Sequence, residues 1–209
     1  MANRGAALDM AVLGLLHESP MHGYELRKRV NALLGWGRVL SYGTLYPCLK
    51  QLLRKGLIEP DTASTTPVEG GGLTGRRARI VYQLTAEGKE HFVQLLGHCG
   101  PSAWDDDSFG VHFAFFGRTD SQTRVRILEG RRSRLEERLD GVRLALSRTR
   151  ERVDSYTLEL QRHGLESVER EVRWLTELID DERSGRSPGA PQSTNRGRAS
   201  ARHRTDPTT

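Results

Sequence analysis

The stretch SYGTLYPCLKQLLRKGLIEP, from Ser41 to Pro60, decides how the first half of this chain folds. Its leucines recur at helical spacing, at Leu45, Leu49 and Leu52, so one side of the predicted helix is buried. The opposite side carries polar and basic groups, namely Thr44, Lys50, Gln51 and Arg54. A glycine then ends the helix, and LIEP continues as a short strand. What the exposed polar side binds is the question that the rest of the chain must answer.

Four further elements surround this helix in the sequence. One helix is predicted from about Ala6 to His17, and a second restarts near Met21–Gly23 and ends at Gly35. The strand-like segments LIEP and ARIVYQL flank a polar, glycine-rich stretch and predict a β-hairpin with a long tip. Thr85 is placed to cap a further helix. Three helices, a hairpin and a helix form a winged helix-turn-helix, in which one helix can enter a DNA major groove.

The second half of the chain begins after CGPSAWDDD, from Cys99 to Asp107. A seam of three- and four-residue steps follows, made of Val125, Leu128, Leu135, Leu139, Val142, Leu146, Val153, Tyr156 and Leu160. This spacing predicts one continuous helix in a coiled coil, ended by Gly164. A shorter stripe then folds back or meets a partner, and it comprises Leu165, Val168, Val172, Leu175 and Ile179.

The predicted architecture is mainly α with a small β-hairpin. It divides into a winged helix-turn-helix domain (residues 1–100), a helical, coiled-coil dimerisation domain (residues 101–182) and a disordered basic tail (residues 183–209). The apolar residues of the seam and the shorter stripe are the predicted dimer contacts. An unpaired stripe of this length would otherwise expose a large apolar patch.

The net charge of +5 is unevenly distributed along the chain. Residues 1–100 hold 12 Lys and Arg against 8 Asp and Glu, residues 101–182 hold 14 against 18, and the tail holds 6 against 1. The two basic ends favour an anionic partner for the first domain and the tail. Charge alone fits nucleic acid, a membrane surface or an acidic protein.

Composition disfavours several classes of protein. Cys48 and Cys99 form no CxxC pair, which argues against a disulfide framework or a zinc site and fits a reducing cytoplasm. No apolar run reaches the ~18 residues of a membrane span, and Asp9 interrupts the N-terminal apolar stretch, so no signal peptide is expected. The scattered histidines suggest no catalytic arrangement. Neither an enzyme nor a cofactor is expected, and the acidic run at residues 105–107 is interpreted as a linker or helix start and not as a metal site.

Candidate DNA contacts lie on the predicted Ser41–Lys55 helix and at the hairpin tip. Hydroxyl groups at Ser41, Tyr42, Thr44 and Tyr46 can bind phosphates or base edges, and Lys50 can neutralise a phosphate or reach a guanine. The tip contributes Arg76, Arg77 and Arg79, which suit backbone contact or minor-groove insertion. The alternatives are that the helix residues pack against the neighbouring helix and that the arginines are simply solvated.

Three segments resemble the signature segments of the PadR family of bacterial transcription regulators: MHGYELRKRV, SYGTLYPCLKQLLRKGLIEP and RIVYQLTAEGKE. The resemblance covers roughly residues 8–95. It implies a winged helix-turn-helix homodimer that usually represses transcription at a palindromic operator, with a C-terminal helical dimerisation region. By this resemblance Ser41, Gly43, Thr44, Tyr46 and Lys50 match the recognition helix, His22, Gly23 and Tyr24 belong to the helix before it, and Arg76, Arg77 and Arg79 match the wing. The wing is longer and richer in glycine than the usual family form.

The expected partners are double-stranded operator DNA and a second copy of the chain. The alternative function is a protein-interaction module that uses its long coiled coil and binds DNA with little specificity. A steep loss of affinity with salt distinguishes true DNA contact from this alternative.

An aromatic cluster falls where the two predicted domains meet, and it comprises Trp104, Phe109, His112, Phe113 and Phe116. Some PadR relatives hold flat aromatic ligands in such places, so the resemblance raises a small aromatic effector as a possible partner. The spacing of the three phenylalanines also fits an ordinary buried helix face. Trp104 lies outside that spacing.

Overall fold

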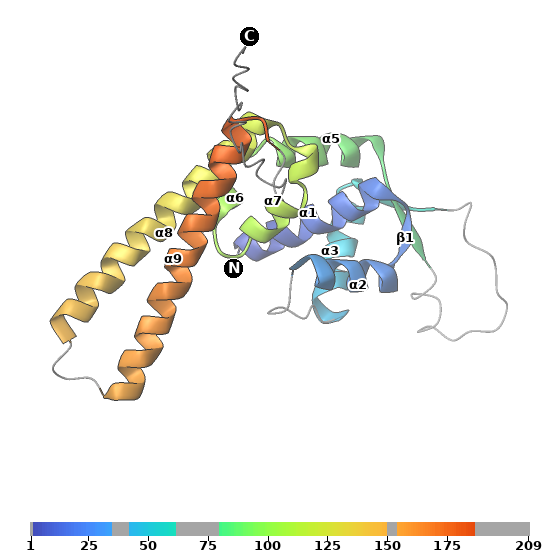
Figure 1. Ribbon diagram of the computed structural model, residues 1–209. Helices are drawn as coiled ribbons and strands as arrows, with labels where there is room; N and C mark the ends of the chain where they lie inside the picture. The colour runs from blue at the N-terminus through green and yellow to red at the C-terminus, as the bar shows by residue number, and fades with distance from the viewer. Residues whose placement is uncertain (1, 35–41, 62–79, 150–153, 187–209) are drawn as a thin grey trace, which may run out of the picture.

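The computed structural model describes residues 2–34, 42–61, 80–149 and 154–186. These residues form a winged half and a pair of long helices that projects from it (Figure 1). No helix in the described ranges is both long enough and apolar enough to cross a lipid bilayer.

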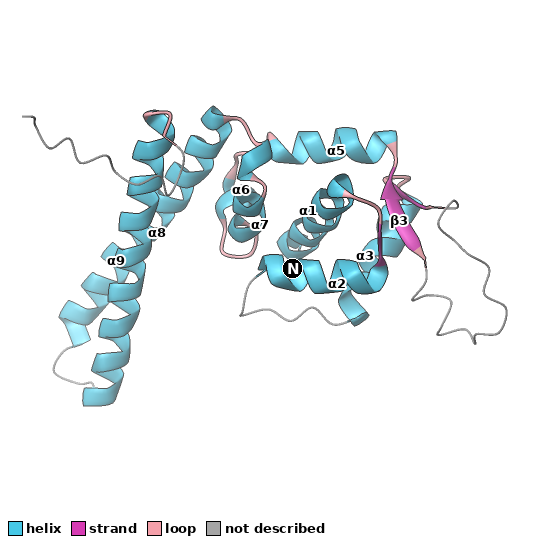
Figure 2. Cartoon of the chain, turned by 45° about the vertical axis from the view of Figure 1, so that its right-hand side comes forward, coloured by secondary structure: helices cyan, strands magenta, loops and turns pink. Residues whose placement is uncertain are grey.

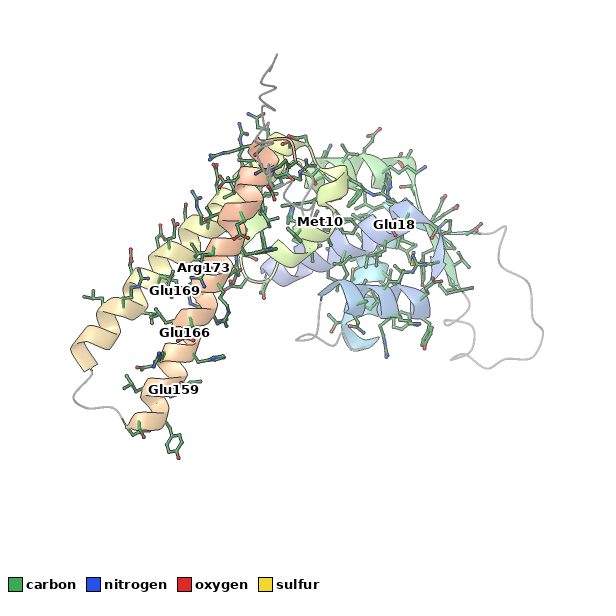
Figure 3. All side chains as sticks on the ribbon, viewed as in Figure 1. Met10, Glu18, Glu159, Glu166, Glu169 and Arg173 are labelled. Carbon is green, nitrogen blue, oxygen red and sulfur yellow. The ribbon has the colours of Figure 1, made fainter. Side chains whose placement is uncertain are left out.

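The winged half is built around its first helix. Its helices are α1 (Ala2–Glu18), α2 (Gly23–Leu34), α3 (Tyr42–Arg54) and α5 (Ala86–Leu96). The middle of α1 is enclosed by the other three, and Met10 (labelled in Figure 3) and Leu13 are at most 2% exposed. The predicted helices are confirmed, although α1 begins before Ala6.

A small antiparallel sheet lies at one edge of the winged half (Figure 2). Its strands are β1 (Met21–His22), β2 (Ile58–Pro60) and β3 (Val81–Leu84), in the order β1-β3-β2. The predicted hairpin of β2 and β3 is present, with Ile58 opposite Leu84. β1 was not predicted, because two residues are too few to show alternation. Thr85 caps α5 as predicted, since its hydroxyl accepts a hydrogen bond from the Gly88 backbone N at 3.0 Å.

The C-terminal half consists of short helices followed by two long ones. They are α6 (Pro101–Trp104), α7 (Phe109–Ala114), the 3₁₀ helix η1 (Phe116–Arg118), α8 (Ser121–Thr149) and α9 (Ser155–Arg183). α8 and α9 lie side by side in both views (Figures 1 and 2). Asp154 caps α9, because its Oδ1 accepts hydrogen bonds from the backbone N of Tyr156 at 3.0 Å and of Thr157 at 3.1 Å.

The prediction of one continuous helix from Val125 to Leu160 is wrong. α8 ends at Thr149 and the chain returns as α9, so the apolar stripes of the two helices meet within one chain. Gly164 ends no helix and lies inside α9. Heptad spacing shows that a helix has a packing partner, but it does not show whether that partner is another chain.

The predicted dimer contacts therefore differ in exposure. The residues buried within the single chain are Leu128, Leu135, Leu139, Leu175 and Ile179. The half-buried residues are Val125, Val142, Leu165, Val168 and Val172. Tyr156 and Leu160 are 88% and 70% exposed. Val153 and the side chain of Leu146 lie outside what the structure describes.

The segment around α7 belongs to two hydrophobic cores. Val111 and Phe115 are part of the core of the winged half, whereas Phe109 is part of the core between α8 and α9. The Phe115 ring lies on Gly14 of α1, where a Cβ atom would be 2.2 Å from the ring. The Phe115 ring also contacts the Phe92 ring edge-on, with the ring centroids 5.4 Å apart. The two halves are thus joined through packed side chains as well as through the chain itself.

Candidate nucleic-acid interface and effector cavity

α3 presents a polar side to solvent. Leu45, Leu49 and Leu52 are at most 1% exposed and hold the helix on the core. The exposed residues of the opposite side are Thr44, Pro47, Lys50, Gln51 and Arg54. This distribution confirms the two-sided helix predicted from the sequence. Pro47 also lies on the exposed side, three residues after Thr44.

The other recognition-helix candidates differ in position. Tyr46 is half-buried, and its ring lies 3.8 Å from the position that a Cβ atom would take at Gly23 of α2. Packing thus accounts for part of the Tyr46 side chain. Tyr42 and Gly43 begin α3, but the side chain of Tyr42 is outside what the structure describes, as is Ser41 altogether. The three wing arginines, Arg76, Arg77 and Arg79, also lie outside the described residues.

β1 and α2 carry further exposed polar side chains. The resemblance assigned His22 to this helix, but His22 is an exposed residue of β1. Tyr24 of α2 is 60% exposed although it carries a large ring. Tyr24 and Lys28 border a shallow depression on α2. Arg29, on the same helix, is paired with Glu25 at 2.8 Å. An exposed tyrosine hydroxyl and a lysine on one helix are groups that bind phosphate oxygens.

The exposed charge on α2 and α3 is mainly positive. Lys28, Lys50 and Arg54 are all exposed, and Arg54 Nε donates to the backbone carbonyl of Lys50 at 3.4 Å. Exposed basic side chains on these two helices provide the kind of electrostatic attraction on which DNA binding depends.

A cavity of about 540 Å³ lies where η1 meets α8 and the C-terminal end of α9. Its lining includes Phe113, Phe116, Ser121, Arg124, Leu178 and Glu182. Arg124 spans the site, because its Nη2 donates to Glu182 Oε2 at 2.8 Å and its Nη1 donates to the carbonyls of Phe116 and Thr119 at 3.0 and 2.6 Å. The cavity therefore combines an aromatic wall with a tethered guanidinium group.

Two of the five predicted effector residues line this cavity. Phe113 and Phe116 do so, with their ring centroids 5.0 Å apart. Phe109 is buried and is not among the lining residues, and its ring centroid lies 5.8 Å from that of Phe113. Trp104 and His112 are not among the lining residues.

Trp174 of α9 joins the aromatic cluster and was not predicted. Its ring centroid is 5.3 Å from that of Phe113 and 6.4 Å from that of Phe109. The sequence carries no local signal for this contact, because only the return of α9 along α8 brings Trp174 to α7.

His112 lies next to the cluster in an environment that keeps it neutral. Burial, together with the nearby His98, lowers the pKa of His112 from 6.5 to about 4, although Asp105 partly opposes this shift. The imidazole is therefore uncharged at neutral pH.

The acidic run takes part in a local turn and in an ion pair. Asp105 Oδ1 accepts hydrogen bonds from the backbone N of Asp107 at 2.9 Å and of Ser108 at 2.7 Å. Asp106 pairs with Arg131, and the hydrogen bond from this guanidinium holds the pKa of Asp106 below its usual value. Within the part of the chain that the structure describes, no group of three His, Cys, Asp or Glu side chains is placed to hold a metal ion.

Comparison with known proteins agrees with the sequence resemblance. Residues 12–94 match the family model described as Transcriptional regulator PadR-like family. Members of this family are transcriptional regulators and not enzymes. No curated protein matches the sequence significantly.

Similar solved structures come from the same family. A PadR-like transcriptional regulator from Bacillus cereus is 21% identical, with 85% of this chain and 99% of that chain covered and a TM-score of 0.37. Bacillus subtilis PadR in complex with operator DNA is 20% identical, with 84% and 98% covered and a TM-score of 0.38. Bacillus subtilis PadR in complex with p-coumaric acid is 19% identical, with 85% and 99% covered and a TM-score of 0.37.

Proposed function

We propose, from the premise that residues 12–94 belong to the PadR-like family of transcriptional regulators, that this chain is a DNA-binding regulator and acts as a dimeric repressor at a palindromic operator. The observation that carries the proposal is the exposed side of α3, where Thr44, Lys50 and Gln51 face solvent opposite a buried leucine stripe. A helix of this kind fits the B-DNA major groove, about 12 Å wide. The symmetry of a dimer then matches the symmetry of a palindrome.

The proposed contacts divide by role. Lys50 and Gln51 read base edges, because their side chains are long enough to reach the floor of the groove. Arg54, His22, Tyr24 and Lys28 bind phosphates on either side. The remaining proposed contacts are Ser41, Tyr42, Gly43, Thr44 and Tyr46 at the start of α3 and Arg76, Arg77 and Arg79 in the wing.

A binding experiment tests this function directly. Purified protein is used to select fragments of the source genome, and the affinity for the selected sequence is then measured across a salt series. Specific DNA binding requires a shared palindrome among the fragments and a logarithm of affinity that falls linearly with the logarithm of salt concentration. Fragments without a shared sequence, bound equally at all salt concentrations, would favour the protein-interaction module instead.

The dimer is proposed to form through the outer end of the α8–α9 pair. Four large apolar side chains are exposed there, namely Leu144, Tyr156, Leu158 and Leu160. Glu159 and Glu166 project from the same stretch of α9 (Figure 3), so the apolar residues are bordered by charge. Exposed apolar residues gathered at one end of a helical pair indicate a protein contact.

Sedimentation of charged variants tests this dimer. Leu160→Glu, at an exposed position, is expected to give folded monomers with weakened operator binding. Leu135→Glu, at a position only 2% exposed, is expected to unfold the helical pair instead. A Leu160→Glu protein that stays dimeric and binds the operator normally would place the dimer contact elsewhere.

A small aromatic effector is proposed for the cavity beside η1. The cavity has the volume of a small-molecule site, and the Phe113 and Phe116 rings can stack on a flat ligand. Flat aromatic compounds can be titrated while tryptophan fluorescence and operator binding are followed. Trp174 contacts Phe113, so quenching should be lost in Trp174→Phe and kept in Trp104→Phe. If no compound both quenches Trp174 and weakens operator binding, the cluster serves packing alone.

A further inference from the structure

The segment that joins the two halves packs against α8 through Trp104, whose ring lies on Gly130. A Cβ atom at position 130 would lie 2.3 Å from Trp104 Nε1 and 2.5 Å from Trp104 Cδ1. Real Cβ atoms do not approach other atoms this closely, so the indole ring of Trp104 occupies space that only glycine leaves open. α6, which ends at Trp104, is thereby held directly against the backbone of α8.

The next residue of α8 clamps the same segment. Arg131 is only 8% exposed, and its Nη1 donates to Asp106 and, at 3.5 Å, to the Trp104 carbonyl. Its Nε and Nη2 donate to Glu171 of α9 at 3.0 and 2.9 Å. Its guanidinium carbon also lies 5.3 Å from the centroid of the Phe109 ring. One buried charge thus connects the joining segment, α7, α8 and α9.

A buried guanidinium with this many partners has little freedom to move. Loss of one partner leaves charge uncompensated in a poorly solvated place, so the alternative arrangements of the segment are unfavourable. The Trp104 contact is independent of the Arg131 contacts because it depends on shape and not on charge. Two different kinds of interaction therefore fix one orientation of the joining segment on α8.

We propose that Gly130 with Trp104, and Arg131 with Asp106 and Glu171, form a linker anchor that sets the distance between the two recognition helices of a dimer. The inference rests on the proposed function, since it requires two copies joined through their α8–α9 pairs. In such a dimer each winged half is positioned relative to the partner only by the way it is attached to its own helical pair. Half-sites one DNA turn apart, about 34 Å, are matched only when this attachment is fixed. The anchor therefore determines which half-site spacing the protein accepts.

If the anchor sets the distance between the recognition helices, its loss should change the preference for one half-site spacing over another, and not affinity alone. The operator selected by the wild-type protein is compared with operators that carry one or two base pairs more or fewer at the centre. Gly130→Ala displaces the Trp104 ring, because the new Cβ atom would overlap it. For each protein, the affinity for the operator with native spacing is divided by the affinity for an operator with altered spacing. In Gly130→Ala this ratio is expected to fall towards unity by roughly 5- to 150-fold, which is the range of a typical coupling between two sites. Gly141→Ala is the matched control, because it lies on the same helix with nothing within 4 Å and should keep the wild-type ratio.

Two further variants decide the outcome if Gly130→Ala does not fold. Glu171→Gln keeps the volume but removes one of the charges that hold Arg131, and it should lower the same ratio. Trp104→Ala should lower it as well, and adding Gly130→Ala to Trp104→Ala should change nothing more, because the clash is then absent. A folded Gly130→Ala or Glu171→Gln protein with the wild-type ratio overturns the inference. Absence of operator binding by the wild-type protein would instead contradict the proposed function itself.

Discussion

The Cys48 thiol, on α3, donates a hydrogen bond to Asp9 Oδ1, on α1, across 3.2 Å. Asp9 also pairs with Lys55, just beyond the end of α3, at 3.7 Å. α3 is therefore attached to the central helix by polar contacts as well as by its leucines. Burial raises the pKa of the Cys48 thiol well above its usual value, and the Asp9 carboxylate raises it further. The thiolate, which is the reactive form, is strongly disfavoured at Cys48.

Thiol labelling should distinguish the two cysteines. Cys48 is buried and Cys99 is half-buried, so one thiol per chain is expected to react with a soluble disulfide reagent in the native protein and two in denaturant. The fast reaction should vanish in Cys99→Ser. Rapid labelling of Cys48 in the folded Cys99→Ser protein would show that α3 readily separates from the core.

Lys50→Ala should weaken operator binding, by about 1–3 kcal/mol if the ammonium group reads a base. Lys89→Ala, at an exposed lysine of α5, is the matched control and should bind as the wild type does. If Lys50 contacts a phosphate only, the loss should be equal for all DNA sequences and the salt dependence should become shallower. An unchanged affinity in both Lys50→Ala and Thr44→Ala would remove α3 from the proposed interface.

Two glycines should respond oppositely to alanine. A Cβ atom at Gly88 would lie 1.9 Å from the backbone carbonyl oxygen of Leu57, so Gly88→Ala should destabilise the protein by about 1–3 kcal/mol. Nothing lies within 4 Å of a Cβ at Gly164, inside α9, so Gly164→Ala should stabilise it by roughly 0.5–1 kcal/mol. Chemical denaturation measures both changes. A destabilised Gly164→Ala protein would argue that the chain turns at this position, contrary to the structure.

His112 should make stability depend on pH in the mildly acidic range. Its pKa is about 4 when folded and 6.5 in the unfolded chain, so the unfolded chain binds more protons between these values. The contribution of His112 to the free energy of unfolding is fully present above pH 6.5. It falls by about 3 kcal/mol as the pH falls towards 4. Denaturation of His112→Gln between pH 7 and pH 4 should show a flatter dependence than the wild type, and equal slopes would contradict this.

Removal of residues 187–209 should change salt dependence but not operator choice. This cut keeps Arg186, which pairs with Asp181 at 3.0 Å, and removes four arginines and one aspartate. The slope of log affinity against log salt should fall by up to about 0.9 for each arginine that contacts a phosphate. Repeating the fragment selection with the shortened protein checks the second part. A different selected sequence would mean that the tail reads bases.

The sequence was most informative where local patterns determine structure. The leucine spacing of α3, the cap at Thr85 and the apolar strands β2 and β3 each depend on neighbours in the chain, and each was predicted. The reversal between α8 and α9 was missed, because the seam continues with coiled-coil spacing across the turn. Trp174 and Glu171 were missed for the same reason, since their partners on α7 and α8 are reached only after the chain has turned back.

The position of α7 between two cores limits how relatives of this protein can exchange parts. A recombination event at residue 100, between the apparent domains, would separate Phe115 from Gly14 and Phe92, with which it packs. The winged half of such a chimera would carry a hole in its core unless the donor supplied a ring of the same shape. A crossover after Thr119 keeps Phe115 with its own winged half. The donor of the long helices must then supply a side chain that packs against Phe109 and Phe113 as Trp174 does. Successful exchanges should therefore be found among relatives that share the residues around α7, even where their long helices have diverged.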